Sequence, residues 1–342
     1  MILLILLHLP VYCILRIARC NRTLHGYIQD DQLWAQLLSR DYCLAAQLGS
    51  SKTIYMQVYG SRMLLIGGYS EHVLSSVLGF SDDFWIRKQA IPVARFSATA
   101  TIRNNSQVIV ACGMDAAGDT TIRLFVYDIL QNHWRKFRPS LPFAVQRAFI
   151  TCINDRLFVF GASVCSGLPL LLRLNMNEAL RWTELPPMPQ SREGAAYGVY
   201  GDKVFIVGGF LAWNLSDTVD CFDTRTNSWN FRCSRMPIQC AHASAVVHGK
   251  YLYVFGGRTL SNAINCVQRY DMVNDVWTIM SAMPTARWNT AAAMYRGRIY
   301  VLGGETDTDT VSSVEIYTPE TDRWTMGPKL PYHVHGASAV SW

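Results

Sequence analysis

Residues 241–287 read AHASAVVHGKYLYVFGGRTLSNAINCVQRYDMVNDVWTIMSAMPTAR and hold four short runs rich in β-forming residues. Turn residues such as Gly249-Lys250 and Asn274-Asp275 separate the runs. The run YLYVF is apolar throughout, which is typical of a strand buried on both faces, and Gly256-Gly257 ends it. Four such runs in succession predict a four-stranded antiparallel sheet.

This unit recurs along most of the 342-residue chain. Six tryptophans follow one another at steps of 49, 48, 47, 48 and 47 residues: Trp85, Trp134, Trp182, Trp229, Trp277 and Trp324. A glycine doublet or its remnant precedes each one, namely Gly67-Gly68, Cys112-Gly113, Gly161-Ala162, Gly208-Gly209, Gly256-Gly257 and Gly303-Gly304. A fixed period of this length is the signature of stacked or radially arranged repeats.

The order of features within each unit identifies the type of repeat. An apolar run is followed by Gly-Gly, then Tyr270-Asp271, then Trp277, and then Pro284 and Arg287 in a Pro-x-x-Arg pattern. This order resembles the kelch repeat, and the resemblance covers about residues 60–342. It implies a β-propeller with one blade per repeat around a central channel. We therefore expect an all-β fold, a six-bladed kelch propeller over residues 63–342, preceded by a short α-helical segment.

The end of the chain indicates how the ring closes. After Trp324 the sequence runs to HGASAVSW at 335–342, which is the opening strand of a repeat with no Gly-Gly strand after it. We expect this strand to pair with residues 63–67 of the first blade. Residues 54–58 are the alternative occupant of that place. Closure is favoured because it leaves the sheet ring without exposed edges.

The first 15 residues, MILLILLHLPVYCIL, are apolar and allow three interpretations. A signal peptide or membrane anchor is disfavoured, because no positive region precedes the stretch, Pro10 interrupts it, and no small-residue cleavage site follows. It is also shorter than the ~20 residues that span a bilayer. The second interpretation is an unrelated helical cap, and the third rests on the residues that follow.

Residues 15–42, LRIARCNRTLHGYIQDDQLWAQLLSRDY, resemble the second half of an F-box. The matching positions are Cys20-Asn21-Arg22, Leu24, Asp31, Leu33-Trp34, Leu37 and Arg40-Asp41-Tyr42. The chain departs from the family at its start, where the usual L-P-x-E is missing. The resemblance implies an F-box-like segment over 1–50 and a linker over 51–62. It also implies contact with a Skp-family adaptor through Leu4, Leu7, Ile14, Ile17, Leu24, Leu33, Trp34 and Leu37.

Composition narrows the classes of function. The formal net charge is +6, from 31 Lys and Arg against 25 Asp and Glu, and these charges are scattered, so we expect no nucleic-acid binding. The ten cysteines show no paired spacing, which favours reduced thiols over a disulfide framework. Three N-glycosylation sequons, at Asn21, Asn104 and Asn214, would become usable only in a secreted chain.

Catalytic and metal sites are not indicated. His333 and His335 form the one local histidine pair, and no third ligand accompanies them. The acidic loop 306–310 lacks the spacing of a calcium loop. The glycine doublets punctuate strands and do not form a phosphate loop. We therefore expect no enzyme activity, no metal and no cofactor.

Two groups of residues are candidates for binding a target protein. The first is a ring expected near one mouth of the channel: Arg95, Arg147, Arg192, His242, Arg287 and His335, placed shortly after the proline that precedes each opening strand. Such a ring suits carboxylate or phosphate, although the arginines could equally brace neighbouring loops. The second group contains interface-forming side chains in the loops: Tyr69, Phe210, Trp213, Arg258 and Trp288.

The leading hypothesis is a substrate-recognition subunit of a cullin–RING (SCF-type) ubiquitin ligase in the cytoplasm or nucleus. The propeller would hold a target through an acidic or phosphorylated motif, and the F-box-like segment would bind a Skp-family adaptor within the cullin complex. Two alternatives remain: a kelch interaction scaffold without a ligase role, and a secreted or lumenal propeller. No membrane association is expected in the leading hypothesis.

Overall fold

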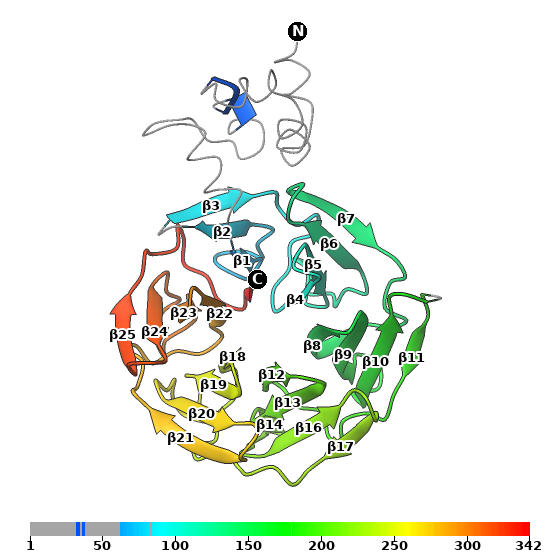
Figure 1. The fold of residues 1–342 in the computed structure, drawn as a ribbon, viewed down its shortest axis with the longest axis vertical. Coiled ribbons are helices and arrows are strands. Elements are labelled where there is room, and N and C mark those ends of the chain that lie inside the picture. The colour runs from blue at the N-terminus through cyan, green and yellow to red at the C-terminus, as the bar shows by residue number, and fades with distance from the viewer. Residues whose placement is uncertain (1–31, 35, 38–61, 82–83, 179) are drawn as a thin grey trace.

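The computed structural model describes residues 32–34, 36–37, 62–81, 84–178 and 180–342. Six four-stranded antiparallel sheets are arranged as blades around a central axis (Figure 1). This is the six-bladed all-β propeller that the repeat period predicts. The innermost strand of each blade lies beside the central channel, and the outermost strand forms the perimeter.

The four strands of each blade are named here from the innermost, beside the channel, to the outermost. Blade 1 contains β26 (Ser338–Ser341), β1 (Met63–Ile66), β2 (Val77–Ser81) and β3 (Phe84–Lys88); blade 2 contains β4 (Thr99–Arg103), β5 (Gln107–Ala111), β6 (Leu124–Asp128) and β7 (His133–Phe137); blade 3 contains β8 (Val145–Ile153), β9 (Arg156–Ser163), β10 (Pro169–Asn175) and β11 (Trp182–Glu184). Blade 4 contains β12 (Ala196–Tyr200), β13 (Lys203–Val207), β16 (Val219–Asp223) and β17 (Ser228–Asn230), with the hairpin β14 (Phe210–Leu211) and β15 (Asn214–Leu215) inserted; blade 5 contains β18 (Ser244–His248), β19 (Tyr251–Phe255), β20 (Val267–Asp271) and β21 (Val276–Met280); blade 6 contains β22 (Ala291–Tyr295), β23 (Arg298–Leu302), β24 (Val314–Thr318) and β25 (Arg323–Met326).

The two ends of the propeller meet in blade 1. Strand β26 pairs antiparallel with β1, with Met63 opposite Ser341 and Ile66 opposite Ser338. The unfinished repeat at the end of the chain therefore supplies the innermost strand of the first blade. Residues 54–58, the alternative occupant, lie outside the described part of the chain.

The core lies between the blades. Each of the six described apolar clusters combines side chains of two adjacent blades, and one of them joins Leu65 and Phe80 of blade 1 to Tyr300 and Leu302 of blade 6. The second strand of each blade is a nearly continuous apolar run because both of its faces contact a neighbouring sheet. The radial arrangement thus follows directly from runs such as YLYVF.

The periodic tryptophans join each blade to the preceding one. Every indole Nε1–H donates to a backbone carbonyl of the segment that enters its own blade: Trp85 to Pro328, Trp134 to Gln89, Trp182 to Ser140, Trp229 to Pro186, Trp277 to Ser234 and Trp324 to Ser281, at 2.8–3.0 Å. The bond from Trp85 to Pro328 crosses the ring closure. The large apolar ring fills the wedge between outer strands, while its polar tip is satisfied by the backbone.

The F-box-like segment is described only in part. Residues 32–34 and 36–37 are helical; Leu33, Trp34 and Leu37 are buried, and Gln32 and Gln36 are exposed. This is one apolar helix face, and its side chains are covered within this chain. Five of the proposed adaptor contacts lie outside the described residues: Leu4, Leu7, Ile14, Ile17 and Leu24. Nothing among the described residues forms a helix long and apolar enough to cross a membrane.

Candidate interaction site at the channel mouth

Three of the predicted arginines are buried braces inside their blades. Arg95 and Arg287 have no exposed surface and Arg192 is 3% exposed. In each case Nη1 donates to the carbonyl of the residue that directly follows the blade's second strand, namely Cys112 (3.1 Å), Gly208 (3.0 Å) and Gly303 (3.0 Å). These guanidinium groups point into the sheet, not into the channel, and the expected ring of free guanidinium donors is corrected accordingly.

The acidic partners of the braces differ between blades. Arg192 forms an ion pair with Asp220 at 2.7 Å, and Arg287 forms one with Glu315, whose side chain is also fully buried. Arg95 instead uses Nη2 to bond the carbonyl of Arg123 at 2.6 Å. Burial lowers the pKa of Arg95 to about 10, so the group stays charged near neutral pH.

The predicted ring also combined residues that are not equivalent in the fold. The carbonyls of Arg95, Cys240, Arg287 and Val334 each accept a hydrogen bond from the second glycine of a doublet, so these four positions correspond. His335 lies one residue after this position in its repeat, and His242 lies two residues after it. Arg147 lies on β8, five residues after Pro142, and its side chain is outside the described part of the structure.

A ring does exist at the mouth, but the backbone forms it. Five residues with φ of +50° to +62° lie just before innermost strands, and they bond in series: His242 N–H to Gly194 O, Asn289 N–H to His242 O, Gly336 N–H to Asn289 O, and Ser97 N–H to Gly336 O, at 2.6–2.9 Å. The series links blades 4, 5, 6, 1 and 2. In blade 3 a register shift between Gln146 and Phe149 takes its place.

Side chains next to this ring form a connected group, which we call the mouth cluster. Its members are Tyr69, Phe96, Phe210, His242, Arg258, Trp288, Asn289, Glu305 and His335. Six of these nine were predicted from the sequence as target-binding residues: Tyr69, Phe210, His242, Arg258, Trp288 and His335. The structure brings those six together because they flank the doublets and the starts of inner strands.

Aromatic contacts run through the mouth cluster. The rings of Tyr69, Phe96 and His335 lie 5.3–5.8 Å apart, centroid to centroid. On the other side, His242 lies 5.5 Å from Trp288, and the Arg258 guanidinium lies 4.8 Å above the Trp288 ring. Such packing restricts the side-chain conformations of the mouth cluster in the unbound protein.

Glu305 joins the two halves of the cluster. Its Oε2 accepts a hydrogen bond from Asn289 Nδ2 at 3.0 Å and lies 3.1 Å from His335 Nδ1. The His335 contact is close but lacks hydrogen-bond alignment. Burial lowers the pKa of His335 and of His242, and nearby carboxylates oppose the shift in each case. Both imidazoles are therefore neutral at physiological pH.

Trp213 lies apart from these contacts at the tip of a hairpin. It is 86% exposed and is the most exposed of the large hydrophobic side chains described. Ala212 and Trp213 form the turn between β14 and β15 with φ of +44° and +74°, a conformation that two-residue hairpins require and that non-glycine residues rarely adopt. A strained turn that presents a tryptophan to solvent is a feature typical of a binding surface.

Three members of the mouth cluster were not predicted from the sequence: Phe96, Asn289 and Glu305. Phe96 follows Arg95 as Trp288 follows Arg287, so alignment on the arginines could have found it. Asn289 was detectable as a residue that tolerates a left-handed backbone. Glu305 lies one residue after a doublet, at the same offset as Tyr69, Phe210 and Arg258.

The described ranges contain no metal-ligand cluster and no disulfide. No group of three or more His, Cys, Asp or Glu side chains there could hold a metal ion. The cysteines described are all free thiols: Cys112, Cys221 and Cys240 are buried, Cys152, Cys233 and Cys266 are half-buried, and Cys165 is exposed.

Comparison with known proteins identifies the family. The model "KLHDC2/KLHL20/DRC7 Kelch-repeats domain" matches residues 54–231, and the model "Attractin/LZTR1 beta-propeller" matches residues 157–342. Each covers more than half of the chain. The protein therefore belongs to the kelch-repeat β-propellers. Both matches lie within residues 54–342, so the F-box resemblance rests on its own sequence motif.

Similar curated proteins are distant and longer. Beta-scruin of Limulus polyphemus is 30% identical over 158 residues, covering 44% of this chain and 17% of that protein. Kelch-like protein 38 of Rattus norvegicus is 26% identical over 207 residues (58% and 34%), and kelch-like protein terF of Aspergillus terreus is 26% identical over 219 residues (58% and 47%). The chain thus spans less than half the length of these relatives.

Proposed function

We propose that this protein recognises a target protein through the mouth cluster and the neighbouring Trp213 hairpin. The observation that carries the proposal is a contiguous set of aromatic side chains and one arginine, held on a backbone ring that the fold makes rigid. Tyr, Trp and Arg are the residues that most often dominate the energy of protein interfaces. A kelch propeller with such a mouth is suited to protein–protein interaction.

Arg258 is the group in the mouth cluster best placed to bind an acidic side chain of the target. Its guanidinium lies over Trp288, and its side chain makes no hydrogen bond or ion pair with any other described residue. Its N–H groups therefore remain available to a carboxylate or phosphate. Since Arg95, Arg192 and Arg287 are committed to their blades, an acidic or phosphorylated target motif would depend on Arg258, not on a ring of arginines.

We further propose that the protein is the substrate-recognition subunit of an SCF-type ubiquitin ligase, acting in the cytoplasm or nucleus. The F-box-like string at 15–42, directly ahead of a propeller, supports this assignment. The chain would perform no bond chemistry; it would raise the concentration of the target near the bound conjugating enzyme.

Binding to purified Skp-family adaptor tests the ligase assignment. The full chain, extended by any coding sequence upstream of Met1, is mixed with adaptor and analysed by size-exclusion chromatography. We expect a stable complex. No complex with the extended chain would reject the ligase role in favour of a scaffold. Glycosylation at Asn214, or cleavage after the apolar start, would instead favour the secreted or lumenal alternative.

Target recognition at the mouth is tested separately. Proteins captured by the wild-type chain are compared with those captured by Trp288→Ala and Arg258→Ala. Phe231→Ala is the matched control, because Phe231 is an exposed aromatic residue that follows the outermost strand β17 of blade 4. We expect one set of partners to be lost with both mouth variants and retained with the control. Equal capture by all variants would place the interface elsewhere.

A further inference from the structure

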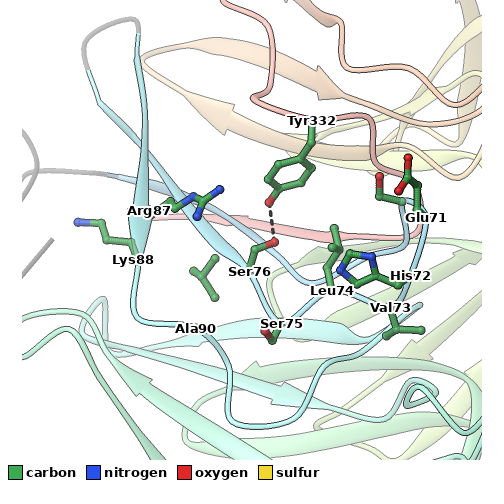
Figure 2. Close-up of a pocket in the computed structure, with 12 residues that line it drawn as sticks. Glu71, His72, Val73, Leu74, Ser75, Ser76, Arg87, Lys88, Ala90 and Tyr332 are labelled. Carbon is green, nitrogen blue, oxygen red and sulfur yellow. Dashed lines mark hydrogen bonds between the residues drawn. The ribbon is translucent and has the colours of Figure 1, made fainter. Parts of the chain in front are cut away.

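A pocket lies outside the mouth cluster, at the junction of blades 6 and 1. It has a volume of about 480 Å³ and is formed by the loop between β1 and β2, the end of β3 and Tyr332 from the segment that enters blade 1 (Figure 2). Pockets that hold small molecules have volumes of about 300–1,000 Å³. The junction is therefore large enough for a ligand of its own.

Arg87 supplies a positive charge to this pocket. It lies on β3, and its guanidinium points toward Tyr332 and Ser76 in Figure 2, whereas the neighbouring Lys88 points away from them. The Arg87 side chain is exposed and makes no ion pair or hydrogen bond with other residues of the described ranges. Its charge acts on the Tyr332 hydroxyl, whose pKa it lowers against the opposing effect of burial.

Two hydroxyl groups face the same space. The Ser76 and Tyr332 hydroxyl oxygens lie 2.5 Å apart and share one hydrogen bond. Because each hydroxyl carries one hydrogen and the shared bond uses only one, the second hydrogen remains available to an acceptor. Burial raises the pKa of Tyr332, which keeps its hydroxyl protonated near neutral pH.

The rest of the wall combines apolar and polar side chains. Val73, Leu74, Val77 and Ala90 line it together with the ring of Tyr332, and its other lining residues are Ser70, Glu71, His72, Ser75 and Lys88. A ligand that fits must therefore combine an apolar body with one group that accepts hydrogen bonds from Arg87 and from a hydroxyl. A carboxylate or a phosphate has this property, since each is anionic and carries several acceptor oxygens.

The combination is specific to this junction of the propeller. Each blade is entered through a segment with a proline, and the residue after that proline is Tyr only at position 332. In the other five junctions it is Val93, Phe143, Gln190, Ile238 or Thr285. The Tyr332 hydroxyl is thus an addition to the repeat and not part of its common framework.

We propose that the pocket between blades 6 and 1 binds a small anionic ligand, with its carboxylate or phosphate at Arg87, Ser76 and Tyr332 and its apolar portion against Val73, Leu74 and Val77. This site does not depend on the mouth cluster or on the ligase assignment. It gives the propeller a second binding site on its flank, beside the loop that carries Tyr69.

Phenyl phosphate and benzoate are the two probes, and benzyl alcohol is the neutral comparison. Binding to the full chain is measured by ligand-observed NMR and by calorimetric titration. We expect at least one acid to bind and benzyl alcohol to bind at least about tenfold more weakly, which is the size of one charge-assisted hydrogen bond. The acid that binds more tightly identifies the anionic group. Binding of neither acid, or equal binding of all three probes, would overturn the proposal.

Variants then locate the bound acid. Arg87→Gln should weaken binding about tenfold, and Tyr332→Phe should weaken it several-fold by removing one hydroxyl hydrogen. Lys136→Gln is the matched control, because Lys136 follows Trp134 by two residues on β7 as Arg87 follows Trp85 on β3. Trp288→Ala should also leave binding unchanged, which separates this pocket from the mouth. Wild-type affinity in Arg87→Gln would overturn the assignment.

Discussion

Replacing Arg287 by methionine should destabilise the propeller strongly. The Arg287 side chain has no exposed surface, bonds the carbonyls of Gly303 (3.0 Å) and Ser313 (3.3 Å), and forms an ion pair with the equally buried Glu315. Methionine fills much of the same volume but leaves the Glu315 carboxylate in the sheet without a counter-charge. Removing one partner of a buried pair typically costs about 3–5 kcal/mol.

That cost can be converted into a melting temperature. The propeller spans residues 63–342. The unfolding entropy is about 2.1 cal/mol/K per residue, so a domain of roughly 280 residues has a total unfolding entropy of about 0.6 kcal/mol/K. The expected fall in Tm is therefore about 5–8 °C. Differential scanning calorimetry measures it, with Arg323→Met, an exposed arginine on β25 of the same blade, as control.

The double variant Arg287→Met with Glu315→Leu sharpens this test. Removing both charges removes the unpaired carboxylate, so most of the lost stability should return, since apolar replacement of a whole buried pair is often nearly neutral. A fall in Tm for Arg287→Met no larger than for Arg323→Met would refute the bracing role. It would make Arg287 available again as a target-binding residue.

Three further perturbations test the fold and the mouth. Gly336→Ala should cost about 1–3 kcal/mol in urea unfolding, because φ is +60° and a Cβ would meet the ring of Phe96; an unchanged midpoint would argue against the backbone ring. Burial lowers the pKa of His242 and His335, so below neutral pH the unfolded state binds more protons than the folded state. The free energy of unfolding is therefore highest above the unfolded pKa of about 6.5 and decreases as the pH falls below it. Replacing both histidines by asparagine should reduce the difference in unfolding free energy between about pH 7.5 and about pH 5.5. The same difference in the variant as in the wild-type protein would contradict the lowered pKa values. Trp134→Phe should cost about 1–2 kcal/mol through loss of the indole hydrogen bond to Gln89 in the segment that enters blade 2, and a neutral effect would show that only ring packing matters.

The repeat pattern was sufficient to predict the architecture. A period fixed by tryptophans and glycine doublets specifies the number of blades, and the runs buried on both faces specify sheets that pack side by side. These features are local and periodic, so a single sequence carries them fully.

The orientation of the arginines was not predictable in the same way. The repeat pattern places Arg95 and Arg287 near the mouth. Their side chains nevertheless turn into the sheet, where the carbonyls of Cys112 and Gly303 accept their hydrogen bonds and Glu315 pairs with Arg287. The partner carboxylate lies 28 residues away in sequence, on the third strand of the blade. The offset of His242 was readable from the sequence, because it lies five residues after Pro237, whereas Arg95 and Arg287 lie three residues after Pro92 and Pro284.

Photo-crosslinking at the mouth tests whether the mouth cluster contacts a target protein. A benzophenone amino acid is placed at position 288 in one variant and at position 231, a solvent-exposed aromatic position on the perimeter, in another. Crosslinking is carried out in cells, and the adducts of the two full-length variants are compared. We expect discrete protein adducts from position 288 that are absent from position 231 and that disappear when Arg258→Ala is added. Identical adducts from both positions, or adducts from position 231 alone, would contradict this expectation.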